Sequence, residues 1–127
     1  MIFGVGTDII EVARVGREIR RSQGFKERCF SPREIAYCDP KASRAQNYAA
    51  RFAAKEAFFK ALGTGYRGGL AFDEVEVLDD RLGKPGIVLR GRAKAYCRRR
   101  RIRRIHVSLA HIKDYSSAVV VMETSPR

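Results

Sequence analysis

Residues 51–65 read RFAAKEAFFKALGTG, and this stretch is the most informative about the architecture. At about 100° per residue, its alanines and phenylalanines cover most sides of a helix, which is typical of a helix buried nearly all round. A charge there costs several kcal/mol unless it is paired or bound to an ion. Glu56 and Lys60 nevertheless lie one turn apart on it. They form either an ordinary ion pair between residues i and i+4 or part of a functional site.

The flanking residues predict that this helix belongs to an α+β fold. SPRE at residues 31–34 has the form of an N-cap with a capping box, and Gly63 can end the long helix in the left-handed conformation. Elsewhere, helical spacing of apolar residues or alternation with polar ones sets the element type. The expected helices span residues 12–21, 31–38, 43–62 and 91–101, and the expected strands span residues 2–7, 72–79, 87–90, 105–111 and 115–123. The prediction is one small domain, residues 1–127, with helices packed on an antiparallel sheet.

The composition indicates a soluble cytosolic protein. No apolar run approaches the roughly 18–20 residues that span a membrane, and the N-terminus lacks the features of a signal peptide. The three cysteines lack Cys-x-x-Cys spacing and only two histidines are present, so a structural zinc site is not expected. We expect the cysteines to be small core residues.

The net charge of +12 is concentrated in one segment. Residues 90–104, RGRAKAYCRRRRIRR, carry nine basic residues and no acidic one, so the rest of the chain has a net charge of +3 (12 − 9). Such a segment suits an anionic partner: a nucleic acid, a phosphorylated ligand or an acidic protein. The alternative is a solvated helix face that maintains solubility.

Several residues together describe a magnesium-assisted phosphoryl-transfer site. Asp8 follows the expected opening strand, and with Glu56 it would supply the one or two carboxylates that Mg²⁺ takes besides water and phosphate oxygens. The glycines of the segments GTG and GKPG allow the backbone to approach a phosphate chain, whose charge Lys60 and Lys84 could neutralise. No P-loop or protein-kinase signature occurs, so nucleotide hydrolysis is not the natural interpretation.

Five segments occur in the order and at the spacing of one enzyme family: GVGTDIIEVARV, RFAAKEAFFKALGTG, FDEVEV, LGKPGIVLRGRA and HVSLAH. Over nearly its whole length, the chain resembles the holo-[acyl-carrier-protein] synthase family of small bacterial 4′-phosphopantetheinyl transferases. The Gly-x-Asp opening and the Phe-x-x-Lys-Glu-x-x-x-Lys-Ala core are specific in combination, whereas each short segment alone is not.

The resemblance implies an activity, a cofactor and partners. The family transfers the 4′-phosphopantetheine group from coenzyme A to a serine of apo acyl carrier protein in fatty acid biosynthesis, with Mg²⁺, and releases adenosine 3′,5′-bisphosphate. Its small α+β subunits assemble as homotrimers, with coenzyme A in clefts between neighbouring subunits. We therefore expect coenzyme A, acyl carrier protein and further copies of this chain as partners, and neither a membrane nor a nucleic acid.

The resemblance also assigns roles to residues. Asp8 and Glu56 occupy the magnesium positions and Lys60 is the conserved lysine of the motif, so these three form the expected catalytic set. Glu56, directly or through a metal-bound water, is the leading candidate base, and Lys60 could steady charge on the departing phosphate. SLAH in place of the more common SLSH removes a hydroxyl at Ala110. The residues expected at the coenzyme are Arg51, Gly63, Gly65, Gly83, Lys84, Pro85, Ser108 and His111.

Some alternatives stay open at this point. Arg51 binds a phosphate or pairs with an acidic neighbour, and His111 contacts the nucleotide or is structural. Three arginines either dock the acidic carrier protein or form a solvated basic face: Arg14, Arg20 and Arg21. The other functions to consider are a small basic RNA- or ribosome-binding module and a purely structural trimer subunit. Against the RNA module, Tyr96 is the only aromatic residue among the arginines, and no RRM or KH signature occurs.

Overall fold

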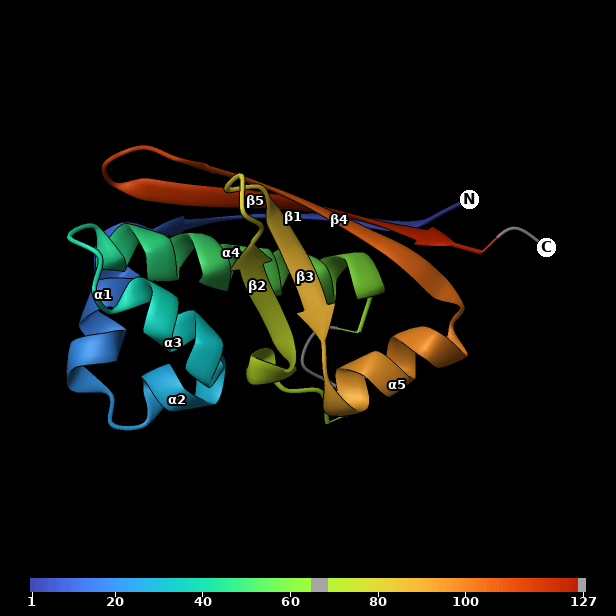
Figure 1. The fold of residues 1–127 in the computed structure, drawn as a ribbon, viewed down its shortest axis with the longest axis horizontal. Helices are drawn as coiled ribbons and strands as arrows, with labels where there is room; N and C mark the ends of the chain where they lie inside the picture. The colour runs from blue at the N-terminus through green and yellow to red at the C-terminus, as the bar shows by residue number, and fades with distance from the viewer. Residues whose placement is uncertain (65–68, 126–127) are drawn as a thin grey trace.

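The computed structural model describes residues 1–64 and 69–125, which form an α+β architecture with helices packed on antiparallel sheets (Figure 1). This confirms the predicted fold class. In chain order, the elements are β1 (Ile2–Glu11), α1 (Val12–Arg21), α2 (Phe25–Cys29), α3 (Pro32–Cys38), α4 (Arg44–Leu62), the 3₁₀ turn η1 (Phe72–Glu74), β2 (Val75–Asp79), β3 (Pro85–Leu89), α5 (Gly91–Arg99), β4 (Ile102–His111) and β5 (Tyr115–Thr124).

Helix α4 lies between a sheet and a layer of shorter elements. The three long strands form one sheet in the order β1–β5–β4, with antiparallel neighbours throughout, and β2 and β3 form a separate hairpin. In Figure 1, α4 runs along the underside of the three strands, and the hairpin passes in front of it. Helices α1–α3 lie at one end of the long axis and α5 lies at the other. The buried character of α4 follows from this position.

Strand β1 crosses α4 at a distance that requires glycine. A Cβ atom at Gly6 would lie 2.0 Å from the carbonyl oxygen of Ala57, and one at Gly4 would lie 2.0 Å from that of Ala61. Small residues on both elements therefore let the two backbones touch. Because alternate residues of a strand share a face, Asp8 lies on the same face as these glycines and is directed toward α4.

Aromatic rings pack along α4 on the side away from β1. The ring of Phe52 lies 5.9 Å from that of Phe25 on α2 and 5.3 Å from that of Phe72 in η1, between centroids. Phe59 lies about two turns further along α4, and its ring centroid is 5.3 Å from that of Phe72. The three cysteines are free and buried, as expected of small core residues. Every helix in the described part of the chain is too short or too polar to span a bilayer.

Local signals predicted the capped ends of helices correctly. Ser31 and Glu34 form the capping box at the start of α3. Gly63 ends α4 with a φ of 84°, in the left-handed region. The last helix, α5, ends at Arg99 and is therefore two residues shorter than the predicted span of residues 91–101.

Two sequence predictions were wrong about strands. The opening strand continues past residue 7 to Glu11, because its backbone pairs with β5 along this length, so Asp8 lies within the strand rather than after it. The segment 72–79 begins with the turn η1, and in β2 the side chain of Glu76 is fully buried rather than exposed. Helix α2 was not predicted, because five residues carry little periodicity and it is held by the burial of Cys29 and the packing of Phe25.

Candidate active site

Asp8 and Lys60 meet where β1 crosses α4. The Nζ atom of Lys60 donates to Asp8 Oδ1 at 2.9 Å and to the backbone oxygen of Thr7 at 3.1 Å. The side chain of Asp8 is 17 % exposed and that of Lys60 is 55 % exposed, so both can be reached from solvent. The main partner of Lys60 is therefore on another element rather than on its own helix.

Glu56 belongs to the same cluster. The hydrogen bond to Asp8 raises the pKa of Lys60, and the negative charges of Asp8 and Glu56 add to this effect. Glu56 is half-buried, one turn before Lys60 on α4. The structure thus brings together all three residues of the predicted catalytic set, and Lys60 keeps its proton at neutral pH.

The carboxylates of this cluster suit a metal ion that takes its remaining ligands from water and from a substrate. Within residues 1–64 and 69–125, no group of three or more Asp, Glu, His or Cys side chains is placed to hold an ion. Two carboxylates and access to solvent are instead what Mg²⁺ uses when water and phosphate oxygens complete its shell. The residues present therefore fit this metal.

The glycine-bearing segments lie in two separate places. Gly63 caps α4 just beyond Lys60, and a Cβ atom there would meet nothing within 4 Å, so its backbone is open to approach. Gly65 lies outside the described residues. Gly83, Lys84 and Pro85 form the exposed end of the β2–β3 hairpin and the first residue of β3. The Asp80 carboxylate fixes this turn by accepting from the backbone N–H groups of Leu82 and Lys84 at 2.8 and 2.9 Å.

Ser108 lies on the opposite face of the large sheet from Asp8, whereas His111 lies on the same face as Asp8, in register with Ser116 on β5. The side chains of Val107 and Leu109 pack on the core, whereas Ser108 between them is exposed. His111, at the end of β4, lines an open hollow of about 260 Å³ together with Ile9 and Tyr115. The structure therefore does not bring Ser108 to the Asp8 cluster of the same chain.

Arg51 lies inside the protein, where it has protein partners. Its side chain donates to the backbone oxygens of Val77 at 3.2 Å and Asn47 at 3.4 Å, and its Nη2 lies 3.6 Å from Asp79 Oδ1. The guanidinium also stacks over the ring of Tyr37 at 4.4 Å. An acidic neighbour is thus present, and a phosphate contact by Arg51 stays a prediction.

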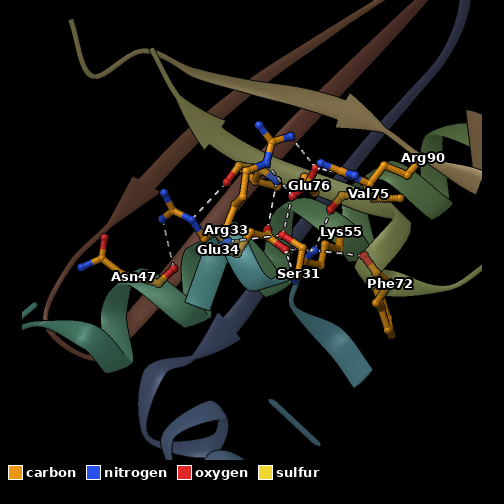
Figure 2. Close-up of polar contacts among 11 residues, drawn as sticks. Ser31, Arg33, Glu34, Asn47, Lys55, Phe72, Val75, Glu76 and Arg90 are labelled. Carbon is orange, nitrogen blue, oxygen red and sulfur yellow. Dashed lines mark hydrogen bonds and ion pairs between the residues drawn. The ribbon is translucent and has the colours of Figure 1, made fainter. Parts of the chain in front are cut away.

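The sequence interpretation missed the buried polar network next to the site (Figure 2). Lys55 is fully buried and donates to Glu34 Oε1 at 2.7 Å, to the Phe72 oxygen at 2.9 Å and to the Val75 oxygen at 2.6 Å. Burial lowers the pKa of Lys55, and the negative charge of Glu34 opposes that shift. Lys55 thereby ties η1 and β2 to the turn of α4 that carries Glu56. Glu34 had been predicted as a capping residue, but its second role depends on partners far away in sequence.

Glu76 is the second acidic residue of this network. Its carboxylate accepts from Ser31 Oγ, from Arg33 at 2.8 and 3.2 Å, and from Arg90 (Figure 2). Burial alone would raise the pKa of Glu76, but the hydrogen bonds from Arg33, Ser31 and Arg90 outweigh burial and lower it to about 2. The network thus joins α3, the hairpin and the start of α5.

The three arginines predicted to dock the carrier protein are exposed on α1, whose buried residues are Val12, Val15 and Gly16. Helix α1 begins four residues after Asp8, so its first residue lies within about 14 Å of Asp8. A basic helix therefore starts next to the site. These arginines are Arg14, Arg20 and Arg21.

Comparison with known proteins gives a consistent result. Residues 4–120 match the model of the 4′-phosphopantetheinyl transferase superfamily. A holo-[acyl-carrier-protein] synthase of Geotalea daltonii is 43% identical over 124 residues, covering 97% of this chain and 99% of the relative. The crystal structure of the holo-[acyl-carrier-protein] synthase from Neisseria meningitidis superposes with a TM-score of 0.89 at 35% identity, covering 98% of this chain and 100% of that one. That of Helicobacter pylori, solved in complex with coenzyme A, gives 0.82 at 32% identity, covering 94% and 99%. The chain belongs to the holo-[acyl-carrier-protein] synthase family of the 4′-phosphopantetheinyl transferase superfamily.

Proposed function

We propose that this chain transfers the 4′-phosphopantetheine group from coenzyme A to a serine of apo acyl carrier protein, releasing adenosine 3′,5′-bisphosphate, as a step of fatty acid biosynthesis in the cytoplasm. The relatives that match it over nearly their full length are named for this activity, and one of them was solved with coenzyme A. The observation that carries the proposal is the convergence of Asp8, Glu56 and Lys60 where β1 meets α4.

Asp8 and Glu56 would hold Mg²⁺ together with oxygens of the coenzyme A pyrophosphate. When bound, the metal supplies positive charge to the transferring phosphorus and to the departing phosphate. Asp8 would then share its oxygens between the metal and Lys60. Lys60, whose pKa is raised, stays protonated and places a cation beside the same phosphates.

The attacking serine must lose a proton as its oxygen bonds to phosphorus and the bond to the bisphosphate breaks. Glu56 is the proposed acceptor, directly or through a water, because it is a half-buried carboxylate within this cluster. Lys55 holds the adjoining turn of α4 in place from inside the protein. The proton acceptor is therefore presented by a rigid helix rather than by a loop.

We propose that each site is shared by two subunits of a homotrimer. Ser108 is separated from Asp8 by the sheet, so one chain cannot place both of them on one coenzyme. The same outer face of the sheet exposes Val5 to 61%, Ile9 to 68% and Val119 to 40%, an apolar surface that a second copy could cover. Packing this face against a neighbour would bring Ser108 toward another subunit's site.

The test is magnesium-dependent release of adenosine 3′,5′-bisphosphate from coenzyme A in the presence of apo carrier protein. We expect release only when the protein, Mg²⁺ and both substrates are present, and we expect EDTA to stop it. An RNA-binding module or a purely structural subunit would release none at any Mg²⁺ concentration.

A further inference from the structure

Apart from Arg90, the arginine-rich segment has no part in the site described above. We define the arginine surface as the exposed cations at the end of α5 and the start of β4, namely Arg98, Arg99, Arg100, Arg101 and Arg103. In Figure 1, α5 lies at the far end of the long axis from α1, and it lies on the side of the large sheet that carries α4. The arginine surface is therefore separate both from the proposed carrier-docking helix and from the outer face proposed to join subunits.

These cations are not neutralised by the protein. In the described part of the chain, none of the five forms an ion pair, whereas Arg90 at the start of the same helix pairs with Glu76. The guanidinium groups of Arg99 and Arg100 lie over the ring of Tyr96, 5.8 and 4.9 Å from its centroid. Tyr96 thus supports two arginines while leaving their charge unpaired.

Backbone geometry adds an independent observation. Arg101 has a φ of 61° and is the only non-glycine residue of the described chain with positive φ. It directly follows the C-cap residue of α5, a position where glycine is the favoured residue. An arginine therefore occupies a position whose backbone conformation favours glycine.

The chemistry of this surface favours phosphates over a membrane or an acidic protein. Within residues 90–104, all of which are described, no large apolar side chain is exposed. Insertion into lipid and the apolar centre of a protein interface both require such side chains. Successive residues at a helix end project about 100° apart, so a flexible chain of phosphates can contact more of these arginines than a flat or rigid partner can.

We propose that the arginine surface binds the phosphodiester backbone of a single-stranded nucleic acid, without base specificity. Each guanidinium can donate two parallel hydrogen bonds to a phosphate. Binding would be electrostatic and would weaken steeply with salt, because each neutralised phosphate releases counterions. This partner is additional to the transfer reaction and does not depend on it.

The test measures binding of fluorescein-labelled oligouridylate of about 20 nucleotides by anisotropy, between about 50 and 200 mM salt. The test variant is Arg98→Gln with Arg99→Gln and Arg100→Gln, and the matched control is Arg14→Gln with Arg17→Gln and Arg21→Gln. Both triple variants lose three positive charges from exposed positions on a helix or, for Arg100, at its C-cap. We expect the α5 variant to bind at least about tenfold more weakly, with the salt slope reduced by about 2, and the α1 control to change far less.

The Arg101→Gly variant tests whether binding is lost because a charge is removed rather than because the fold is damaged. Because glycine is favoured at this position, the variant should unfold at no lower temperature than the parent and still bind the oligonucleotide more weakly. Equal weakening by the α5 and α1 triple variants would overturn the proposal, since binding would then follow net charge alone. Unchanged binding in the α5 variant would also overturn it. The proposal would also be overturned if the α5 variant kept its affinity for the oligonucleotide but lost turnover with the carrier protein. The same holds if it kept that affinity but lost binding to phosphatidylglycerol vesicles.

Discussion

Lys55 and Glu56 are adjacent on α4, yet their side chains lie in different environments. Lys55 is enclosed by Glu34 and two backbone oxygens, so it is committed to holding the fold together. Glu56 is half-buried beside Lys60 and Asp8, where a ligand can reach the cluster. The helix therefore carries a structural charge, Lys55, directly next to Glu56, the charge that we propose to be reactive.

We predict that Glu56→Gln removes most transferase activity, by about 100-fold or more, while the protein stays folded. The amide is a poor metal ligand and cannot accept the serine proton. Turnover at saturating Mg²⁺ and circular dichroism, measured on the same sample, check this. Near-parent turnover in a folded variant would remove Glu56 from both proposed roles.

A pH-dependent prediction follows from Glu76. Its folded-state pKa of about 2 is below the ordinary value of 4.5, so the stability it contributes is present above about pH 4.5 and is lost as the pH falls toward about 2. Glu76→Gln should lower the free energy of unfolding by about 1–3 kcal/mol near neutral pH, with a difference from the parent that shrinks over this acid range. Urea unfolding of both proteins measures it. A difference that stays constant down to about pH 2 would contradict the assigned cause.

At the scale of elements, the crossing of β1 over α4 positions the site, because it sets the distance between Asp8 and Lys60. Gly6→Ala should destabilise the protein by about 1–3 kcal/mol or more, since the added Cβ would overlap the carbonyl oxygen of Ala57. Gly86→Ala is the matched control, because its Cβ would meet nothing closer than the Leu78 oxygen at 3.9 Å. Equal urea midpoints for the two variants would show that the close crossing is not needed.

Helix α1 carries the prediction about the carrier protein. Replacing three exposed arginines by glutamate should raise the KM for apo carrier protein, leave the KM for coenzyme A nearly unchanged and weaken the salt dependence, because opposite charges speed association. The substitutions are Arg14→Glu, Arg20→Glu and Arg21→Glu. Equal losses toward both substrates would mean that α1 supports the coenzyme site or the assembly instead.

At the scale of the whole molecule, we predict a trimer in solution. One chain exposes apolar residues on the outer face of β1 and β5 and leaves Ser108 on the opposite side of the sheet from Asp8. Light scattering at micromolar concentration should give the mass of three chains, and Val119→Glu should lower it. A monomer mass for the parent protein would reject both the trimer and the shared site.

The features predicted from sequence were those with local causes. The capping box of Ser31 and Glu34 and the glycine cap at Gly63 depend on neighbours within a few residues, and they were found. The buried positions of Glu76 and Lys55 depend on partners 14 to 45 residues away, which no local pattern reveals. The cluster of Asp8 with Glu56 was anticipated from the two carboxylates and then supported by the family resemblance, whereas the placement of Asp8 inside a longer strand required the pairing of β1 with β5.

The central claim is that this chain attaches phosphopantetheine to a carrier protein through a magnesium site made by Asp8 and Glu56. Intact-mass spectrometry of apo acyl carrier protein, incubated with coenzyme A and this protein, tests it most directly. We expect a mass gain of one phosphopantetheine group with Mg²⁺, none with EDTA, and none when the acceptor serine of the carrier is replaced by alanine. A carrier protein whose mass stays unchanged with Mg²⁺ and folded enzyme present would contradict it.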